Sequence, residues 1–143
     1  LEAALNEAEK FSDNVLIEKQ VLGREFSVGI LGGKALPPIE IIATGDFYNY
    51  TVKYQAGLAR EICPAPISDE LTIKLQSYAE RAHRALRLGS YSRIDFIMDA
   101  SGEFFFLEAN ALPGMTPTSL LPQEAAANGM SYTELCLKLI ELA

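Results

Sequence analysis

Apolar residues recur along this chain in two patterns, one at helical spacing and one that alternates from residue to residue. The helical pattern is clearest from Ser68, where a 3.6-residue period predicts a helix that is closed by Gly89. Its apolar positions are Leu71, Leu75, Tyr78, Ala82 and Leu86. Residues 2–10 are predicted to be the end of another helix, and Ser131 with Glu134 forms the capping box of a last one. The buried stripe of that last helix is predicted to be Leu135, Leu139 and Leu142.

The alternating pattern predicts strands in the first third of the chain. Residues 15–20, 25–31 and 39–43 are rich in β-branched and other apolar residues, and glycines or prolines separate them. The first two runs are close together across Gly23, which favours antiparallel pairing between them. Residues 45–66 have no steady period, and we expect a long ordered loop there.

Two more strands are predicted at residues 93–98 and 103–109, on either side of a turn at 99–102. Strands and helices in this mixed order predict an α+β fold built in layers.

Composition and charge narrow the classes of protein. With 143 residues and 49% hydrophobic content, the chain is predicted to form one domain with its own core. The net charge of −7 argues against nucleic acid as the main partner, because phosphate neutralisation needs a basic face. No membrane-length apolar run or signal segment is present, and Cys63, Cys136 and the single His83 match no zinc spacing. We therefore expect a cytoplasmic protein without membrane contact, and a start at Leu1 suggests processing or a piece of a longer protein.

The predicted hairpin has the clearest candidate chemistry. Side chains alternate between the two faces of a strand, so Arg93 and Asp95 share a face of the first strand. The same alternation places four residues on one face of the second strand: Phe104, Phe106, Glu108 and Asn110. Two registers are open, with Asp95 opposite either Phe106 or Glu108. In both of them Asp95 and Glu108 share a face, ~5–8 Å apart.

Two carboxylates that close, among phenylalanines, resist ionisation unless a cation lies between them. The oxygen ligands of Asp95, Glu108 and Asn110 suit Mg²⁺. A salt bridge to Arg93 is the alternative, in which the hairpin is an ordinary surface feature with an ion pair on its solvent side.

Three other segments have weaker signals. After Asn110, a turn with Gly114 leads to Thr118 or Ser119, either of which can cap a helix that begins near Leu120. This is an anion site built from free backbone N–H groups, or only a capped turn.

The segment at 47–54 has Lys53 among tyrosines, as in a lid over phosphates or a surface aromatic cluster. Residues 18–25 are compatible with an edge strand that binds adenine and ribose. They are equally compatible with an ordinary edge strand whose charged side chains are solvated.

Taken together, these segments resemble the D-alanine–D-alanine ligases of the ATP-grasp superfamily. The matching pieces, in the family's order, are VLIEKQVLGREFSVGIL, FYNYTVKY, SRIDFIMDASGEFFFLEANALPGMTPTSLLP and AAANGMSYTELC. The segment LEAN-x-x-PGMT-x-x-S is the specific one. The resemblance implies that residues 1–143 are the C-terminal portion of an ATP-grasp fold, an antiparallel sheet with flanking helices. It also implies a reaction in which ATP phosphorylates one D-alanine carboxylate and the amine of a second D-alanine attacks it.

The resemblance implies roles for individual residues. Asp95, Glu108 and Asn110 would hold two Mg²⁺ ions, or Mn²⁺, that bridge the ATP phosphates. Arg93 and the backbone N–H of Gly114 would stabilise negative charge on the acyl phosphate and the tetrahedral intermediate.

The carboxylate of the second D-alanine would bind at Ser119 and Leu120, and Lys53 with Tyr54 would belong to a loop that closes over the site. The expected nucleotide-binding residues are Glu18, Lys19, Val21, Glu25 and Phe47.

The chain also departs from the family's pattern. Asn49 stands where Asp is more frequent, and the family's N-terminal domain and first half of the ATP-binding region have no counterpart here. We therefore expect no ligase activity from the chain alone, and a homodimer in the intact enzyme. The alternatives are another ATP-grasp carboxylate–amine ligase, such as a D-alanine–D-lactate ligase, which the Lys53-Tyr54 pair disfavours, or a non-catalytic nucleotide-binding module.

Overall fold

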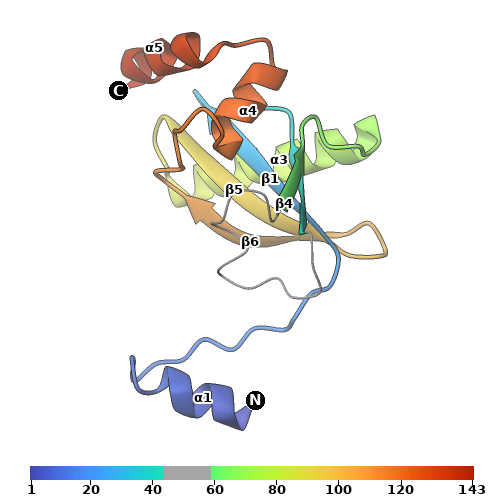
Figure 1. Cartoon of the computed structure of the whole chain (residues 1–143), viewed down its shortest axis with the longest axis vertical. Helices are drawn as coiled ribbons and strands as arrows, with labels where there is room; N and C mark the ends of the chain where they lie inside the picture. The colour runs from blue at the N-terminus through green and yellow to red at the C-terminus, as the bar shows by residue number, and fades with distance from the viewer. Residues whose placement is uncertain (44–58) are drawn as a thin grey trace.

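The computed structural model describes residues 1–43 and 59–143. The helices are α1 (Glu2–Ala8), α3 (Asp69–Leu86), α4 (Leu120–Ala127) and α5 (Tyr132–Leu142). The strands are β1 (Arg24–Leu31), β2 (Lys34–Ala35), β3 (Ile39–Ala43), β4 (Ala59–Ile62), β5 (Tyr91–Met98) and β6 (Phe104–Asn110). Figure 1 shows a curved antiparallel sheet with α3 and α4 packed against it and α1 apart from it. The predicted α+β class is confirmed.

The described strands pair antiparallel in the order β4-β3-β1-β5-β6, and the short β2 also pairs with β1. Strand β1 is therefore central, and its residues from Phe26 onward are buried. A strand that is covered on both faces and paired on both edges needs a nearly continuous apolar sequence, as β1 has.

The larger core lies between the sheet and α3. Even-numbered residues of β1, among them Phe26 and Val28, face Leu75 and Ala79 of the helix. The helix predicted from Ser68 is confirmed as α3, and Ser68 caps it, because its hydroxyl accepts a hydrogen bond from the Leu71 N–H at 3.3 Å.

The C-terminal end of α3 differs from the prediction. The helix ends at Leu86, and Arg87 takes the left-handed conformation with φ 53°, so Gly89 lies in the turn beyond it. The side chain of Leu86 is 53% exposed, and the buried stripe continues instead through His83. The imidazole of His83 is satisfied there by the Ser92 hydroxyl at 2.7 Å and by the Gly89 carbonyl at 3.1 Å.

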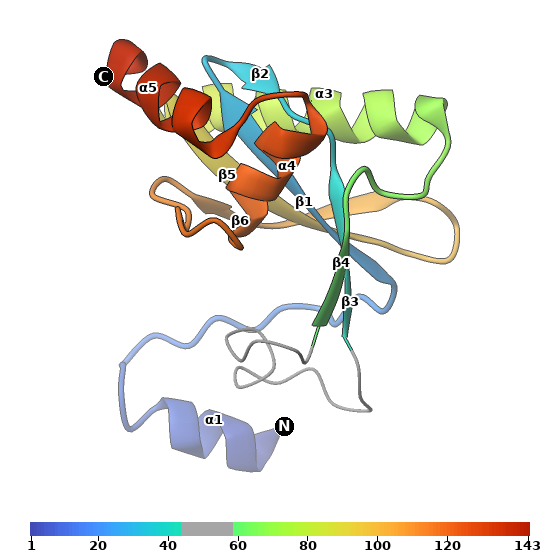
Figure 2. The ribbon, with the colours of Figure 1, turned by 45° about the horizontal axis from the view of Figure 1, so that its top comes forward.

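A second core lies on the opposite face of the sheet, under α4 and α5. Figure 2 shows α3 behind the sheet and α4 in front of it, and the contacts of both helices with β1 agree with that view. Leu121, Ala125 and Leu135 are buried in this cluster. The capping box of Ser131 and Glu134 at the start of α5 is confirmed. Leu139 and Leu142 pack against the cluster, as the stripe predicted.

Two predictions for the first half of the chain are wrong. Residues 15–20 form no strand and do not pair with β1, because β3 and β2 occupy one edge of β1 and β5 occupies the other. Leu16 is 81% exposed, and α1 buries no residue. The expected loop at 45–66 contains β4, which pairs with β3. Residues 44–58 of that loop lie outside the described part of the chain.

Candidate active site

The hairpin of β5 and β6 brings the two predicted carboxylates together. Asp95 lies opposite Glu108, and Arg93 lies opposite Asn110. Nearer the turn the register is different, since Phe96 pairs with Phe106, and a β-bulge separates the two registers. The pairing of Asp95 with Glu108 therefore agrees with one of the two open registers, but it is produced by a bulge.

The bulge also corrects the prediction that four residues of the second strand share a face. The extra residue, Leu107, turns the chain over, so Phe104 and Phe106 lie beside α3 while Glu108 and Asn110 face the other side. The rings of Phe96 and Phe106 meet edge to face, with centroids 6.1 Å apart. The carboxylates consequently lie apart from the phenylalanine cluster.

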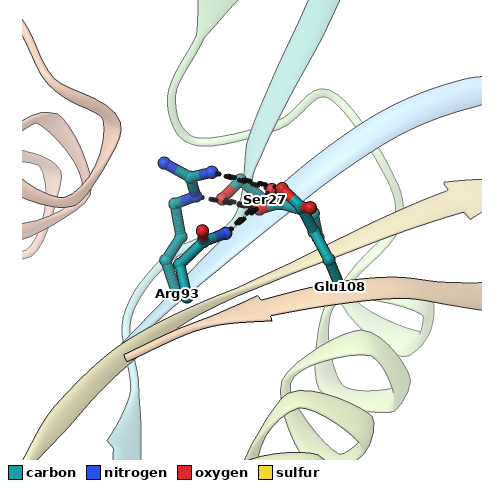
Figure 3. Close-up of polar contacts among 5 residues, drawn as sticks. Ser27, Arg93 and Glu108 are labelled. Atoms are coloured by element: carbon teal, nitrogen blue, oxygen red, sulfur yellow. Dashed lines mark hydrogen bonds and ion pairs between the residues drawn. The ribbon is translucent and has the colours of Figure 1, made fainter. Parts of the chain in front are cut away.

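Asp95 is the centre of a polar cluster, of which Figure 3 labels Ser27, Arg93 and Glu108. Its side chain is 1% exposed, and Arg93 donates to both of its oxygens, through Nε at 3.0 Å and Nη2 at 2.8 Å. The hydroxyl of Ser27 on β1 donates to Asp95 Oδ1 at 2.9 Å. Asn110 Nδ2 donates to Glu108 Oε1 at 3.3 Å and approaches Asp95 Oδ2 at 3.5 Å. Every member therefore has a partner, as a buried polar cluster requires.

The charge of this cluster is balanced chiefly by Arg93. Burial acts to lower the pKa of Arg93, but hydrogen bonding to Asp95 and the negative charges of Asp95, Glu124 and Glu108 raise it overall. Arg93 Nη2 also lies 3.9 Å from Glu108 Oε1, so one guanidinium serves both carboxylates. Because the Asp95 end is buried, removing either partner leaves an uncompensated charge.

The residue types around Asp95 fit a magnesium ion. Asp95, Glu108 and Asn110 supply oxygen atoms from adjacent strands on one face, the donor set that this ion prefers. Within residues 1–43 and 59–143, no group of three His, Cys, Asp or Glu side chains is suited to a metal. The site thus has two carboxylates and an amide, and a cation at Asp95 would compete with Arg93 for the carboxylate oxygens.

The turn after β6 is built around two of the predicted residues. Ser119 occupies the N-cap position of α4, but its hydroxyl accepts from the Thr116 N–H at 3.1 Å and does not cap the helix. A Cβ on Gly114 would lie 2.9 Å from Ser119 Oγ, so glycine permits this approach. The Tyr132 hydroxyl of α5 donates to the Met115 carbonyl at 2.6 Å and holds the same turn.

A cavity of about 610 Å³ lies between residues 18–25 and the strands of the sheet. Four of the predicted nucleotide-binding residues line it: Glu18, Lys19, Val21 and Glu25. Ile41 of β3 and Ile97 of β5 contribute apolar walls, which suit a flat heterocycle. The fifth, Phe47, lies outside the described residues, as do Lys53 and Tyr54 of the predicted closing loop.

Three residues near the site were missed by the sequence reasoning. Ser27 and Gly29 alternate with the apolar residues of β1, so a row of small residues on one face was visible in the sequence. Glu124 lies at helical spacing from Leu121 and is buried with it. The signal for Glu124 was therefore a carboxylate on the apolar face of a helix.

The arrangement of sheet, hairpin and C-terminal helices occurs in solved D-alanine ligases. The D-alanine–D-alanine ligase of Bacillus anthracis matches with a TM-score of 0.85 and 32% identity, over 99% of this chain and 46% of that one. The same enzyme complexed with ATP matches with a TM-score of 0.83. VanG, a D-Ala:D-Ser ligase of Enterococcus faecalis, matches with a TM-score of 0.84 and 30% identity, over 99% of this chain and 42% of its own. The fold is therefore that of the ATP-grasp ligases, in their C-terminal portion.

Sequence relatives define the family. The D-alanine–D-alanine ligase of Oleidesulfovibrio alaskensis is 52% identical over 99% of this chain, and that of Citrifermentans bemidjiense is 45% identical over 100%. The family model for the C-terminus of D-ala D-ala ligase matches residues 1–141. The chain belongs to the D-alanine–D-alanine ligase family, as its motifs indicated. It spans 46% and 47% of the length of these two relatives.

Proposed function

We propose that this chain is the C-terminal part of a ligase that uses ATP to join two D-alanines through an acyl phosphate, in peptidoglycan precursor synthesis. The observation that carries the proposal is the opposed pair of Asp95 and Glu108, with Arg93 between them, in a member of this family. The cavity lined by Glu18 and Val21 supports a nucleotide site in the same chain.

Within this proposal, two Mg²⁺ ions are bound by Asp95, Glu108 and Asn110. Mn²⁺ can replace Mg²⁺ there. Such ions neutralise the phosphate charge that develops during transfer of the γ-phosphoryl group. The side chains of Glu18, Lys19, Val21, Glu25 and Phe47 bind the adenine and ribose.

Anionic groups of the reaction are stabilised by Arg93 and by the backbone N–H of Gly114. Fixed hydrogen-bond donors in a site that excludes water supply most of the stabilisation of negative charge in a transition state. Ser119 and Leu120 begin α4 and bind the carboxylate of the second D-alanine, where the free N–H groups of a helix start favour an anion. Lys53 and Tyr54 close over the site.

The second substrate is D-alanine in this proposal, and the fold alone does not discriminate it from others. TM-scores of 0.85 to a D-Ala–D-Ala ligase and 0.84 to a D-Ala:D-Ser ligase are equivalent. The curated relatives at 52% and 45% identity support D-alanine. D-alanine–D-lactate ligation and a non-catalytic nucleotide-binding module are outcomes that the experiment below distinguishes.

The experiment is ADP release from Mg-ATP, with and without D-alanine, by two polypeptides. One is this chain, and the other adds the N-terminal half of the Oleidesulfovibrio alaskensis relative. We expect D-alanine-dependent release from the longer polypeptide only, with loss of at least a hundredfold on Asp95→Asn. Release with D-lactate but not D-alanine as the second substrate would reassign the product. Nucleotide binding without turnover by the folded longer polypeptide would leave a binding module.

Location and assembly are also proposals. Within the described residues, no helix is long and apolar enough to cross a membrane. We propose a cytoplasmic enzyme that acts as a homodimer, and sedimentation of the longer polypeptide at several concentrations tests the dimer.

A further inference from the structure

One buried carboxylate near the site has no hydrogen-bond partner. Glu124 of α4 is 0% exposed, and neither of its oxygens accepts a hydrogen bond from any of the described residues. Two other buried carboxylates, Asp95 and Glu40, are each paired with an arginine. An unpartnered buried polar group costs about 1–3 kcal/mol, so the position of Glu124 needs a reason beyond packing.

Glu124 occupies the place of a side chain that β1 lacks. A Cβ built on Gly29 would lie only 2.5 Å from Glu124 Oε2, so the carboxyl group lies directly over this glycine. Gly29 is the residue opposite Arg93 in the pairing of β1 and β5. Paired residues in antiparallel strands have Cβ atoms ~4.5–5.5 Å apart on the same face. Gly29 has no side chain to contact Arg93, so the Glu124 carboxyl group takes that place beside Arg93.

The electrostatics agree with this neighbourhood. Burial raises the pKa of Glu124 well above its ordinary value, the Gly29 backbone N–H lowers it, Asp95 raises it and Arg93 lowers it. The Gly29 N–H is close enough to exert this effect, although its geometry is not that of a hydrogen bond. An ionised Glu124 would therefore attract Arg93 across the space above Gly29.

Arg93 has a nitrogen available for a second carboxylate. Its Nε and Nη2 donate to Asp95, while Nη1 donates to none of the described residues. In Figure 3 this third nitrogen of Arg93 points away from Ser27 and Glu108. The guanidinium can therefore contact another acceptor without reversing its side chain.

We propose that Glu124 is a positioning residue that binds and orients Arg93 when the Asp95 carboxylate coordinates a metal ion. This inference rests on the proposed function, in which Asp95 is a ligand and Arg93 faces an anion. Asp95 Oδ1 already accepts from Arg93 and Ser27, and Oδ2 accepts from Arg93, so a metal ion at Asp95 competes with Arg93 for the same lone pairs. Glu124 then supplies the replacement partner from α4, and Gly29 leaves room for it.

The test is a double-mutant cycle on Mn²⁺ binding to the full 143-residue chain, followed by electron paramagnetic resonance. Glu124→Gln keeps the shape of the side chain and removes its charge. We expect this change to weaken Mn²⁺ binding about tenfold in the wild-type background and less than twofold in an Arg93→Met background. Glu61→Gln is the charge-matched control, because exposed Glu61 accepts a hydrogen bond from Gln123 of the same helix.

The cycle separates the positioning role from a direct attraction between Glu124 and the metal. An equal loss in both backgrounds, or no loss in either, would overturn the proposal. If the wild-type chain binds no Mn²⁺, the proposed metal site is wrong as well. If wild type and Glu124→Gln bind Mn²⁺ with equal affinity, only the positioning role of Glu124 is wrong.

A spectroscopic measurement on the same chain gives an independent outcome. The Nε–H resonance of Arg93 should remain sharp when Mg²⁺ is added to the wild-type chain, because Glu124 replaces Asp95 as its partner. In Glu124→Gln the same addition should broaden it or remove it by exchange with water. Identical spectra of the two chains in Mg²⁺ would contradict the proposed change of Arg93 partner from Asp95 to Glu124.

Discussion

Replacing Gly29 by alanine tests the close approach of α4 to β1. The new Cβ would lie 2.4 Å from Leu121 Cδ1, 2.5 Å from Glu124 Oε2 and 3.2 Å from Leu36 Cδ1. Leu121 and Glu124 are both 0% exposed, so neither can move into solvent without opening the second core. The backbone of Gly29 does not have a positive φ, so alanine is acceptable there apart from these contacts.

The magnitude follows from two opposing effects. Overpacking of a buried site costs about 1–3 kcal/mol, while replacing glycine by alanine within an element recovers roughly 0.5–1 kcal/mol. We therefore expect Gly29→Ala to lower the free energy of unfolding by about 1–2 kcal/mol.

Urea denaturation, followed by circular dichroism, measures the change in unfolding free energy. Glu124→Ala removes one of the two clashing groups, so the double variant Gly29→Ala/Glu124→Ala should lose less stability than the two single changes predict by addition. A Gly29→Ala chain within 0.3 kcal/mol of wild type, or strict additivity in the double variant, would refute the close approach of Glu124 to β1.

Three further predictions concern buried polar groups. Because the folded-state pKa of Glu124 is raised, wild-type stability falls as pH rises above the unfolded pKa of about 4.3, until the folded-state pKa is reached. In paired urea titrations Glu124→Gln should equal wild type near pH 4 and be more stable at pH 7, with the difference growing by up to about 1.4 kcal/mol for each pH unit between the two pKa values. Burial, with the charge of Glu124 adding to it, raises the pKa of Cys63 to about 12, so iodoacetamide at pH 8 should alkylate this thiol about a thousandfold more slowly in the native chain than in urea; similar rates by mass spectrometry would contradict its burial. Ser27→Ala should cost about 1–3 kcal/mol in urea denaturation, because Asp95 loses a buried donor, whereas Ser101→Ala in the exposed turn should change stability by less than about 0.5 kcal/mol.

Local sequence patterns predicted the elements whose stability is local. The helix from Ser68 and the capping box at Ser131 depend on spacings within a few residues, so sequence alone is enough to place them. The hairpin was predicted for the same reason, since its turn and its two strands are contiguous.

Features that depend on distant pairing could not be predicted in this way. Residues 15–20 are as rich in apolar residues as a strand, but β3 and β5 occupy the edges of β1, and that competition is set by tertiary structure. The bulge before Phe96 is likewise invisible to simple alternation, which is why Phe106 was placed on the wrong face.

The candidate site was predicted in part. The shared face of Asp95 and Glu108 follows from alternation on each strand near the base of the hairpin, and the structure retains it. Ser27 and Glu124 come from elements 68 residues before and 29 residues after Asp95, so only the assembled sheet brings them to it. The metal and nucleotide roles of these residues stay predictions.

Anomalous diffraction from Mn²⁺ tests the central claim most directly. Crystals of the longer polypeptide, grown with ADP and Mn²⁺, should contain anomalous peaks between Asp95 and Glu108, with the adenine in the cavity that Glu18 and Val21 line. Arg93 should no longer be bidentate with Asp95 in those crystals. Nucleotide bound in the cavity without a peak at the carboxylate pair would contradict the metal site, and Arg93 still paired with Asp95 would show that the pair is structural.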